Sequence, residues 1–223
     1  MPAIETPLTR RLVVLAVVVA AFVALTLVVE AGWLGSLDRQ VLIAVSGIWS
    51  EPLHPLFQLL AELGGLEVTS ILMLGLLIYL WRAGFGAGAL VVLAYPAAVA
   101  LEVLYKMLFY HPGPPRATAH RDGPSVTDFL TGAGNLNSFP SGHVVRAVVA
   151  YGLIAFVVRR LAPWPSVRQL AIPVAVVLLV VEAFDRIYLD VHWESDVIGA
   201  LLLGSIALIS ATVWLDRPVR TDN

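Results

Sequence analysis

His192 and Asp196 lie four residues apart near the start of an apolar run, and their side-chain types suit nucleophilic chemistry. Residues four apart share one face of a helix, so the carboxylate can bind the imidazole ring. Such a bond fixes the tautomer, raises the basicity of the other ring nitrogen and stabilises the cation that forms on attack. The pair therefore predicts a histidine nucleophile, with a carboxylate-capped interfacial histidine as the alternative.

A second cluster, Pro140-Ser141-Gly142-His143, directly precedes the apolar run that begins at Val144. Pro and Gly interrupt the chain here, which predicts that a helix begins at this point. The free amides and dipole of a helix N-terminus suit an anion, glycine allows close backbone approach, and Ser141 adds a hydroxyl donor. We expect a phosphate site at which His143 protonates a leaving alkoxide. An ordinary loop-to-helix junction is the alternative.

Two cations complete the set of candidate residues. Lys106 ends an apolar run, and Arg186 precedes His192 by six residues. An arginine can hold phosphate oxygens in a bidentate contact, and a lysine can add a point charge. The alternatives are that Lys106 reaches toward lipid headgroups and that Arg186 pairs with Asp185 or Asp190.

The elements that must position these residues are membrane-spanning helices. Hydrophobic residues make up 59% of the 223 residues, charged residues make up 13%, and the mean hydropathy is +0.85. A helix needs about 20 mostly apolar residues to cross a bilayer. We therefore predict an all-α, polytopic membrane helix bundle, a single domain over residues 1–223. Its six transmembrane helices are expected at about 12–29, 66–81, 86–109, 142–158, 170–184 and 193–215.

The first of these runs follows Arg10 and Arg11, so a signal peptide is an alternative for it. Its apolar core is longer than that of a signal peptide, and the residues that follow make a poor cleavage site, which favours a retained helix. Residues 32–65 are too broken to span, and apolar spacing around 41–48 and 56–63 predicts short amphipathic helices at the interface. Residues 110–139 are rich in proline and glycine, which predicts a loop.

The arginines in short loops gather on the side of the two termini, so the positive-inside rule places that side in the cytoplasm. The expected location is the plasma membrane of a bacterium. Polar residues at helix ends fall on the opposite, non-cytoplasmic face, where one watery cavity can collect them. These residues are Lys106, Ser141, His143, Arg146, Arg186, His192 and Asp196.

Composition excludes several other classes of protein. The chain has no cysteine, so disulfides, iron–sulfur clusters and thiolate zinc sites are excluded. A net charge of -2 comes with no basic stripe and no acidic tail, so no nucleic-acid partner is expected. The chemistry must use His, Asp, Lys, Arg or Ser side chains.

With these motifs in this order, the chain from Lys106 to Asp196 resembles the type 2 phosphatidic acid phosphatase family, which is related to the haloperoxidases. The family motifs are Lys-x6-Arg-Pro, Pro-Ser-Gly-His and Ser-Arg-x5-His-x3-Asp. The second motif matches completely, and the third matches except that Asp185 replaces its serine. The resemblance implies a phosphohistidine on His192, with Asp196 as its support and His143 as the general acid. It also implies that no metal or cofactor is needed, and that the phosphate ligands are Lys106, Ser141, Gly142 and Arg186.

The first motif departs from the family because Gly113 stands at its arginine position, while the following proline is present as Pro114. Loss of one charge-assisted contact to a transition-state oxyanion costs roughly 3 to 4 kcal/mol. Two arginines are candidates to compensate: Arg116 in the loop, and Arg146 one helical turn beyond His143. We favour Arg146, because a charge that near the start of an apolar helix needs a polar partner.

The leading prediction is metal-independent hydrolysis of a lipid phosphate or diphosphate, such as a polyprenyl diphosphate, phosphatidylglycerophosphate or phosphatidate. A lipid phosphotransferase with the same intermediate is an alternative. Because of Gly113, a weakly active or non-catalytic lipid-phosphate-binding membrane protein is another. The sequence leaves the headgroup, the chain and the oligomeric state open.

Overall fold

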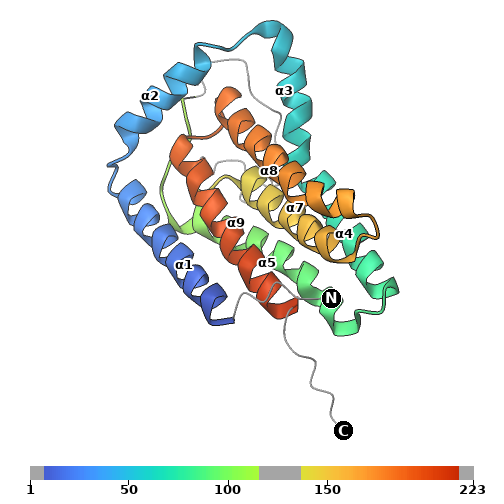
Figure 1. The fold of residues 1–223 in the computed structure, drawn as a ribbon. Helices are drawn as coiled ribbons and strands as arrows, with labels where there is room; N and C mark the ends of the chain where they lie inside the picture. Colours follow the sequence, from blue (N-terminus) through green and yellow to red (C-terminus); the bar gives the residue numbers. More distant parts are fainter. Residues whose placement is uncertain (1–7, 116–136, 216–223) are drawn as a thin grey trace.

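The computed structural model describes residues 8–115 and 137–215, and every regular element in these ranges is a helix (Figure 1). Arg116, one of the candidate phosphate ligands, lies outside the described residues. The longer helices are α1 (Leu8–Glu30), α4 (Leu66–Arg82), α5 (Ala94–Leu108), α7 (Gly142–Leu161), α8 (Pro165–Tyr188) and α9 (Glu194–Leu215). The shorter ones are α2 (Gly35–Ser46), α3 (His54–Ala61) and the 3-10 helices η1 (Glu51–Leu53), η2 (Glu62–Gly64) and η3 (Gly86–Leu93).

The prediction of a helical membrane protein is confirmed at the level of fold class. Within the described residues, four helical segments are long and apolar enough to cross a membrane: Leu8–Glu30, Glu51–Arg82, Gly86–Leu108 and Glu194–Leu215. Helices also form over the two other predicted spans, as α7 and α8, and each is longer than expected. The count of six crossings stays a prediction.

The run predicted as one helix over 86–109 is divided in the structure. It begins as η3 and becomes an α-helix only at Ala94. Gly86 has a φ of +52°, a conformation that glycine adopts most readily, and glycine also weakens an α-helix relative to most other residues. The glycines at the start of this run therefore explain why a regular α-helix begins late.

Helix α7 forms the centre of the bundle and packs against α4, α5, α8 and α9. Two glycines permit its close contact with α9. A side chain at Gly152 would collide with Leu208, and a side chain at Gly204 would collide with Val148. Most of α7 is buried, including Val144, Val145, Val149 and Leu153. The start of this helix is therefore held rigidly, and the Pro-Ser-Gly-His motif lies there.

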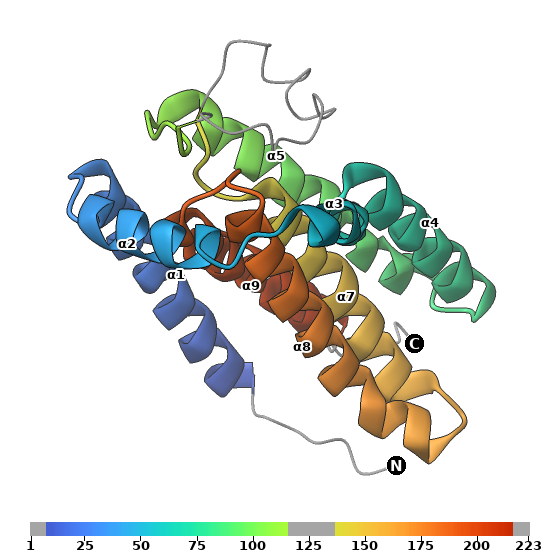
Figure 2. The ribbon, with the colours of Figure 1, turned by 90° about the horizontal axis from the view of Figure 1, so that it is seen from above.

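Helices α2 and α3 form in the segment that was expected to hold short amphipathic helices. Figure 2 shows them passing over one end of the bundle, across the end of α8 and the start of α9. Contacts of α2 with α8 and α9, and of α3 with α8, agree with this view. Their position at the membrane interface stays a prediction.

Candidate active site

The His192–Asp196 pair lies between α8 and the first turn of α9. His192 Nδ1 is 3.3 Å from Asp196 Oδ2, and both residues are buried. A carboxylate can only accept, so Nδ1 carries the hydrogen and Nε2 of the neutral ring keeps its lone pair. The backbone N–H of Trp193 donates to the same Oδ2 at 2.9 Å, which fixes the carboxylate. In this arrangement Nε2 is the ring nitrogen whose lone pair could attack an electrophile.

Burial sets the protonation state of His192. It lowers the pKa of the imidazole below the ordinary value of 6.5, because the charged form loses solvation. The hydrogen bond and charge of Asp196 oppose this shift, while the positive charges of Lys106 and Arg186 add to it. The ring is therefore neutral near pH 7, which is the form that can attack an electrophile.

The second motif forms the start of α7, as the sequence predicted. Ser141 is the N-cap residue, yet its hydroxyl makes no capping bond to the helix. Among the described residues this hydroxyl has no hydrogen-bond partner, although Ser141 is fully buried. Its backbone N–H donates to the Asp196 carbonyl at 3.1 Å, which ties the second motif to the third. A buried, unpartnered hydroxyl at a helix N-terminus is suited to an anion.

Glu102 on α5 joins the first motif to the second. Its carboxylate lies 2.8 Å from Lys106 Nζ and 3.4 Å from Arg146 Nη1, and it is fully buried. The same carboxylate lies against Gly142, where any side chain would collide with it. Glycine at this position therefore permits the close approach of Glu102, which a larger residue would have to displace.

Arg146 is buried, and its guanidinium contacts the backbone of η2 and the side chain of His143. Its Nε donates to the Gly64 carbonyl at 3.0 Å, and its Nη2 lies 3.1 Å from His143 Nδ1. Arginine has no acceptor, so Nη2 donates and Nδ1 accepts. With these partners His143 is neutral and carries its hydrogen on Nε2. The assignment of Arg146 as a replacement for the missing arginine stays a prediction.

Arg186 at the end of α8 is paired with carboxylates. Its Nε donates to Asp185 Oδ2 at 2.9 Å, its Nη2 contacts the same oxygen, and its Nε also lies 3.4 Å from Glu182 Oε1. All three residues are buried. The pairing with Asp185 that was considered as an alternative is thus present.

His111, in the segment that follows α5, lies beside the His192–Asp196 pair. His111 Nε2 lies 3.4 Å from Asp196 Oδ1, so two histidines share one carboxylate. Asn137 holds this segment, since its amide donates to the Lys106 carbonyl at 2.9 Å and its Oδ1 accepts from the His111 N–H at 3.0 Å. The two described ends of the 110–139 loop are joined in this way.

The structure thus brings eight of the nine predicted site residues into one region at the ends of α5 and α8 and the starts of α7 and α9. Electrostatic effects of Lys106 and Arg186 reach both His143 and His192. Sequence reasoning did not select Glu102, Glu182 or His111 for the site. A signal for the two glutamates existed, because an acidic residue inside an apolar run is costly in a membrane and needs a partner.

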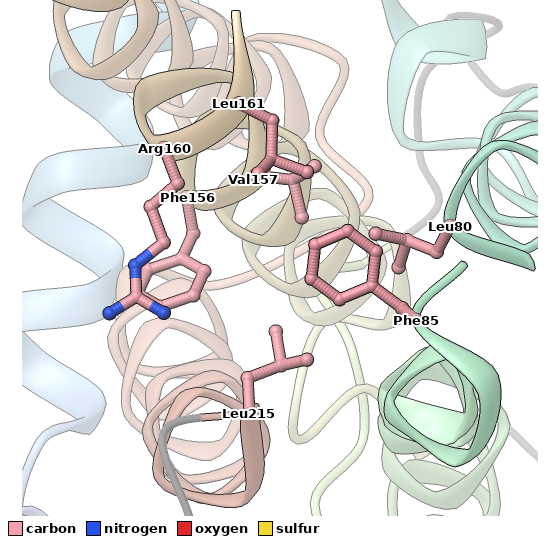
Figure 3. A pocket seen from close by; sticks show the side chains of 7 residues that line it. All are labelled: Leu80, Phe85, Phe156, Val157, Arg160, Leu161 and Leu215. Carbon is pink, nitrogen blue, oxygen red and sulfur yellow. The ribbon is translucent and has the colours of Figure 1, made fainter. Parts of the chain in front are cut away.

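The hollow shown in Figure 3 lies away from this region. It has an empty volume of about 280 Å³ and is lined by Leu80, Phe85, Phe156, Val157, Arg160, Leu161 and Leu215. Val157 is at the other end of α7 from His143, roughly 20 Å along the helix at 1.5 Å per residue. Within the described ranges, no group of three or more His, Asp or Glu residues is arranged to hold a metal ion.

A helical membrane bundle with a buried His–Asp pair, a second histidine and a helix start suited to an anion has features that fit a phosphatase. The sequence profile described as the PAP2 superfamily matches residues 87–220, which is more than half of the chain. The chain belongs to the PAP2 superfamily, and the predicted resemblance and the phosphatase class of enzyme are confirmed.

Three similar proteins agree with this assignment. "Putative undecaprenyl-diphosphatase YbjG" of Escherichia coli K12 is 31% identical over 152 residues, which are 66% of this chain and 67% of that protein. "Phosphatidylglycerophosphatase B" of Bacillus subtilis 168 is 38% identical over 68 residues, 30% of this chain and 34% of that protein. A crystal structure titled as a transmembrane PAP2 type phosphatidylglycerolphosphate phosphatase from Bacillus subtilis has a similar fold. Its TM-score is 0.72 at 24% identity, over 89% of this chain and 94% of that one.

Proposed function

We propose that this membrane protein hydrolyses a lipid phosphate or diphosphate through a phosphohistidine formed on His192. The observation that carries the proposal is the buried Nδ1–carboxylate contact of 3.3 Å between His192 and Asp196, which leaves Nε2 free of a hydrogen. The cations Lys106 and Arg186 act on this ring, and the unpartnered Ser141 hydroxyl lies on the adjoining helix start. These groups are complementary to a phosphoryl group.

In the first step, Nε2 of His192 attacks phosphorus and a nitrogen–phosphorus bond replaces the bond to the leaving oxygen. Asp196 stabilises the positive charge that develops on the ring. The leaving oxygen takes a proton from His143. The negative charge of a bound phosphate favours the doubly protonated ring, in which Nδ1 has given up its contact with Arg146 and taken a proton from solvent. Nε2–H then passes its proton to the leaving oxygen, and a neutral ring remains that can accept a proton from the attacking water in the second step. In the second step, water attacks the phosphohistidine, releasing phosphate and restoring His192.

The proposed orientation places this chemistry on the non-cytoplasmic face of a bacterial plasma membrane, with six helices crossing. Helices α1, α5 and α8 end, and α4, α7 and α9 begin, at the end of the bundle that α2 and α3 pass over (Figure 1). This alternation is what six successive crossings require. It supports the topology that the arginine distribution predicts.

The decisive experiment is phosphate release by detergent-solubilised protein in the presence of a chelator. The substrate panel contains polyprenyl diphosphate, phosphatidylglycerophosphate and phosphatidate. We expect release from at least one of them, abolition by His192→Ala, and an alkali-stable labelled protein after brief incubation with radiolabelled substrate. His54→Ala is the matched control, because His54 lies on α3 outside the proposed machinery.

Each competing function has its own outcome in this assay. Label that passes to an added lipid or sugar alcohol instead of water identifies a phosphotransferase. Binding of the lipids with no release and no labelled protein identifies a binding protein, and it would overturn the proposal. Release that persists in His192→Ala would assign the chemistry to another nucleophile.

Two further variants, Arg146→Gln and Arg116→Gln, test whether either arginine replaces the one that the family motif has at the position of Gly113. If either arginine stabilises the transferring phosphoryl group, we expect its loss to reduce kcat by about 10²-fold to 10³-fold. Arg159→Gln, at the other end of α7, serves as the control. Unchanged turnover and unchanged phosphate inhibition in both variants would refute compensation by these residues.

A further inference from the structure

The loop that carries His192 is held from outside by the segment that begins with α2. Residues 35–50 contact the loop and the ends of the adjoining helices at three points between Tyr188 and Ser195. These are distant in sequence, and the separation at each contact exceeds 130 residues. Residues 35–50, one side of each contact, lie outside the part of the chain that matches the PAP2 superfamily profile, which begins at residue 87.

The first contact caps α9. Asp38 on α2 accepts hydrogen bonds from the backbone N–H of Ser195 at 2.9 Å and from its hydroxyl at 3.0 Å. The first turn of a helix leaves backbone N–H groups without partners, and an acceptor at the residue before the helix normally satisfies one of them. That residue here is Trp193, whose side chain can only donate. Asp38 supplies from another helix the acceptor that the local sequence lacks.

The other contacts act on the preceding residues. Asp190 adopts a φ of +56°, which a residue with a side chain rarely adopts, and its carboxylate accepts from the Ser46 hydroxyl at 2.9 Å. The Tyr188 hydroxyl accepts from the Ser50 N–H at 2.9 Å, and its ring stacks on Phe57 with centroids 3.9 Å apart. His192 therefore lies in a short loop with an anchor on each side.

We propose that Asp38 is a positioning residue for the nucleophile, which sets His192 and Asp196 by capping α9 at Ser195. Asp38 is 4% exposed, and Ser195 and Asp196 are adjacent, so movement at the cap transmits directly to the carboxylate that orients His192. The helix dipole favours a carboxylate at this N-terminus. The expected effect of Asp38 on turnover rests on the proposed function. Its expected effect on the order of the His192 loop rests only on the observed cap.

The test compares four variants of the full chain in detergent: Asp38→Ala, Asp38→Asn, Ser195→Ala and the double variant Asp38→Ala with Ser195→Ala. Asparagine keeps an acceptor oxygen for the Ser195 N–H, so we expect Asp38→Asn to retain most of the turnover. Misplacement of reacting groups by about 1 Å can slow a reaction about a hundredfold, so we expect Asp38→Ala to lower kcat by about tenfold to a hundredfold with KM little changed. Glu51→Gln is the matched control, an exposed carboxylate beyond α2.

Two readouts separate positioning from a purely structural role. The double variant should turn over no more slowly than Asp38→Ala, because Ser195 acts through the same contact. Hydrogen exchange should become faster at residues 191–197 in Asp38→Ala and stay unchanged in Glu51→Gln. Thermal unfolding in detergent shows whether each variant is folded. If Asp38→Ala does not fold, Ser195→Ala decides: lower turnover with faster exchange at residues 191–197 supports the proposal, and wild-type turnover with unchanged exchange overturns it.

Normal kcat in folded Asp38→Ala would overturn the proposal. A raised KM with normal kcat would also overturn it, because α2 would then contact substrate. If the wild-type protein releases no phosphate, the proposed function fails while the exchange experiment still decides whether Asp38 orders the loop. Unchanged exchange at residues 191–197 would overturn that role independently.

Discussion

At the scale of single residues, the charges of the site are balanced by its own side chains. Lys106 and Arg146 share Glu102, and Arg186 contacts Asp185 and Glu182. Burial of an unpaired charge is costly, so these carboxylates hold the cations in place. Under the proposed function, a phosphate must compete with carboxylates for the same cations. We therefore expect these carboxylates to influence phosphate affinity as well as folding.

Asp185 offers the clearest test of this competition, because the family motif has serine at this position. We expect Asp185→Ser to lower KM and to strengthen inhibition by inorganic phosphate, since removal of a negative charge beside Arg186 favours an anion there. The measurements are substrate kinetics and phosphate inhibition in detergent. Glu51→Gln is the control, because it removes an exposed carboxylate outside the site. A raised KM would show that Asp185 is needed to orient Arg186 for substrate.

The lowered pKa of His192 predicts a pH profile. The attacking form is neutral, and it is lost as the pH falls through the pKa of the free enzyme, which kcat/KM reports. We therefore expect kcat/KM to stay level down to pH 6.5 and to fall only below it. The profile should be measured with two substrates whose phosphate groups have different pKa values. The part of the acid limb that is the same for both substrates then reports a group of the enzyme. An acid limb centred above 6.5 would contradict the effect of burial.

At the scale of elements, the contact between α7 and α9 joins the second motif to the third. The hydrogen bond from the Ser141 N–H to the Asp196 carbonyl closes this contact at the end that holds the candidate site. Farther along, Gly204 lets α9 approach α7, and Phe139 packs against Gly199. The relative position of His143 and His192 thus depends on how closely these two helices pack.

Paired alanine substitutions test that packing. A side chain at Gly204 would lie 2.6 Å from Val148 Cβ, so we expect Gly204→Ala to destabilise the protein by about 1 to 3 kcal/mol. A methyl group at Gly75 on α4 would meet nothing within 4 Å, so Gly75→Ala should leave stability unchanged or slightly raised. The midpoint of thermal unfolding in detergent is the measurement. Equal midpoints for the two variants would contradict close packing at Gly204.

At the scale of the whole molecule, alternating helix directions bring the four segments of the candidate site to one end of the bundle. The other end carries the loop between α7 and α8 and the hollow of Figure 3. The separation of these ends along α7 matches the thickness of a bilayer, since a helix of 20 residues is about 30 Å long. The two ends should therefore face opposite sides of the membrane.

The absence of cysteine makes this orientation directly measurable. Tyr110 is 83% exposed near the site, and Trp164 is 66% exposed before α8. We expect Tyr110→Cys to react with a membrane-impermeant maleimide in intact spheroplasts, and Trp164→Cys to react only after permeabilisation. The wild-type chain is the unlabelled control. The reverse pattern would place the site in the cytoplasm.

The sequence was sufficient to predict the helical membrane class and the helices themselves, because an apolar run of this length has few alternatives in a bilayer. It also predicted eight described residues that converge, because two local motifs mark helix starts and the family spacing joins them. It could not show that η3 precedes α5, since the effect of Gly86 depends on a backbone angle. Local spacing also gave no indication of the Asp38 contact with Ser195.

By itself, the sequence predicted the His192–Asp196 pair from helical spacing, and the pair forms with His192 in the loop two residues before α9 and Asp196 in the first turn of that helix. Only the tertiary structure decided the partners of the charged residues. It placed Glu102 between Lys106 and Arg146, put Arg146 on His143 Nδ1, and brought Asp38 to the start of α9. Such contacts join helices far apart in the chain, and they form because a buried charge or backbone N–H must find a partner in whichever element packs against it.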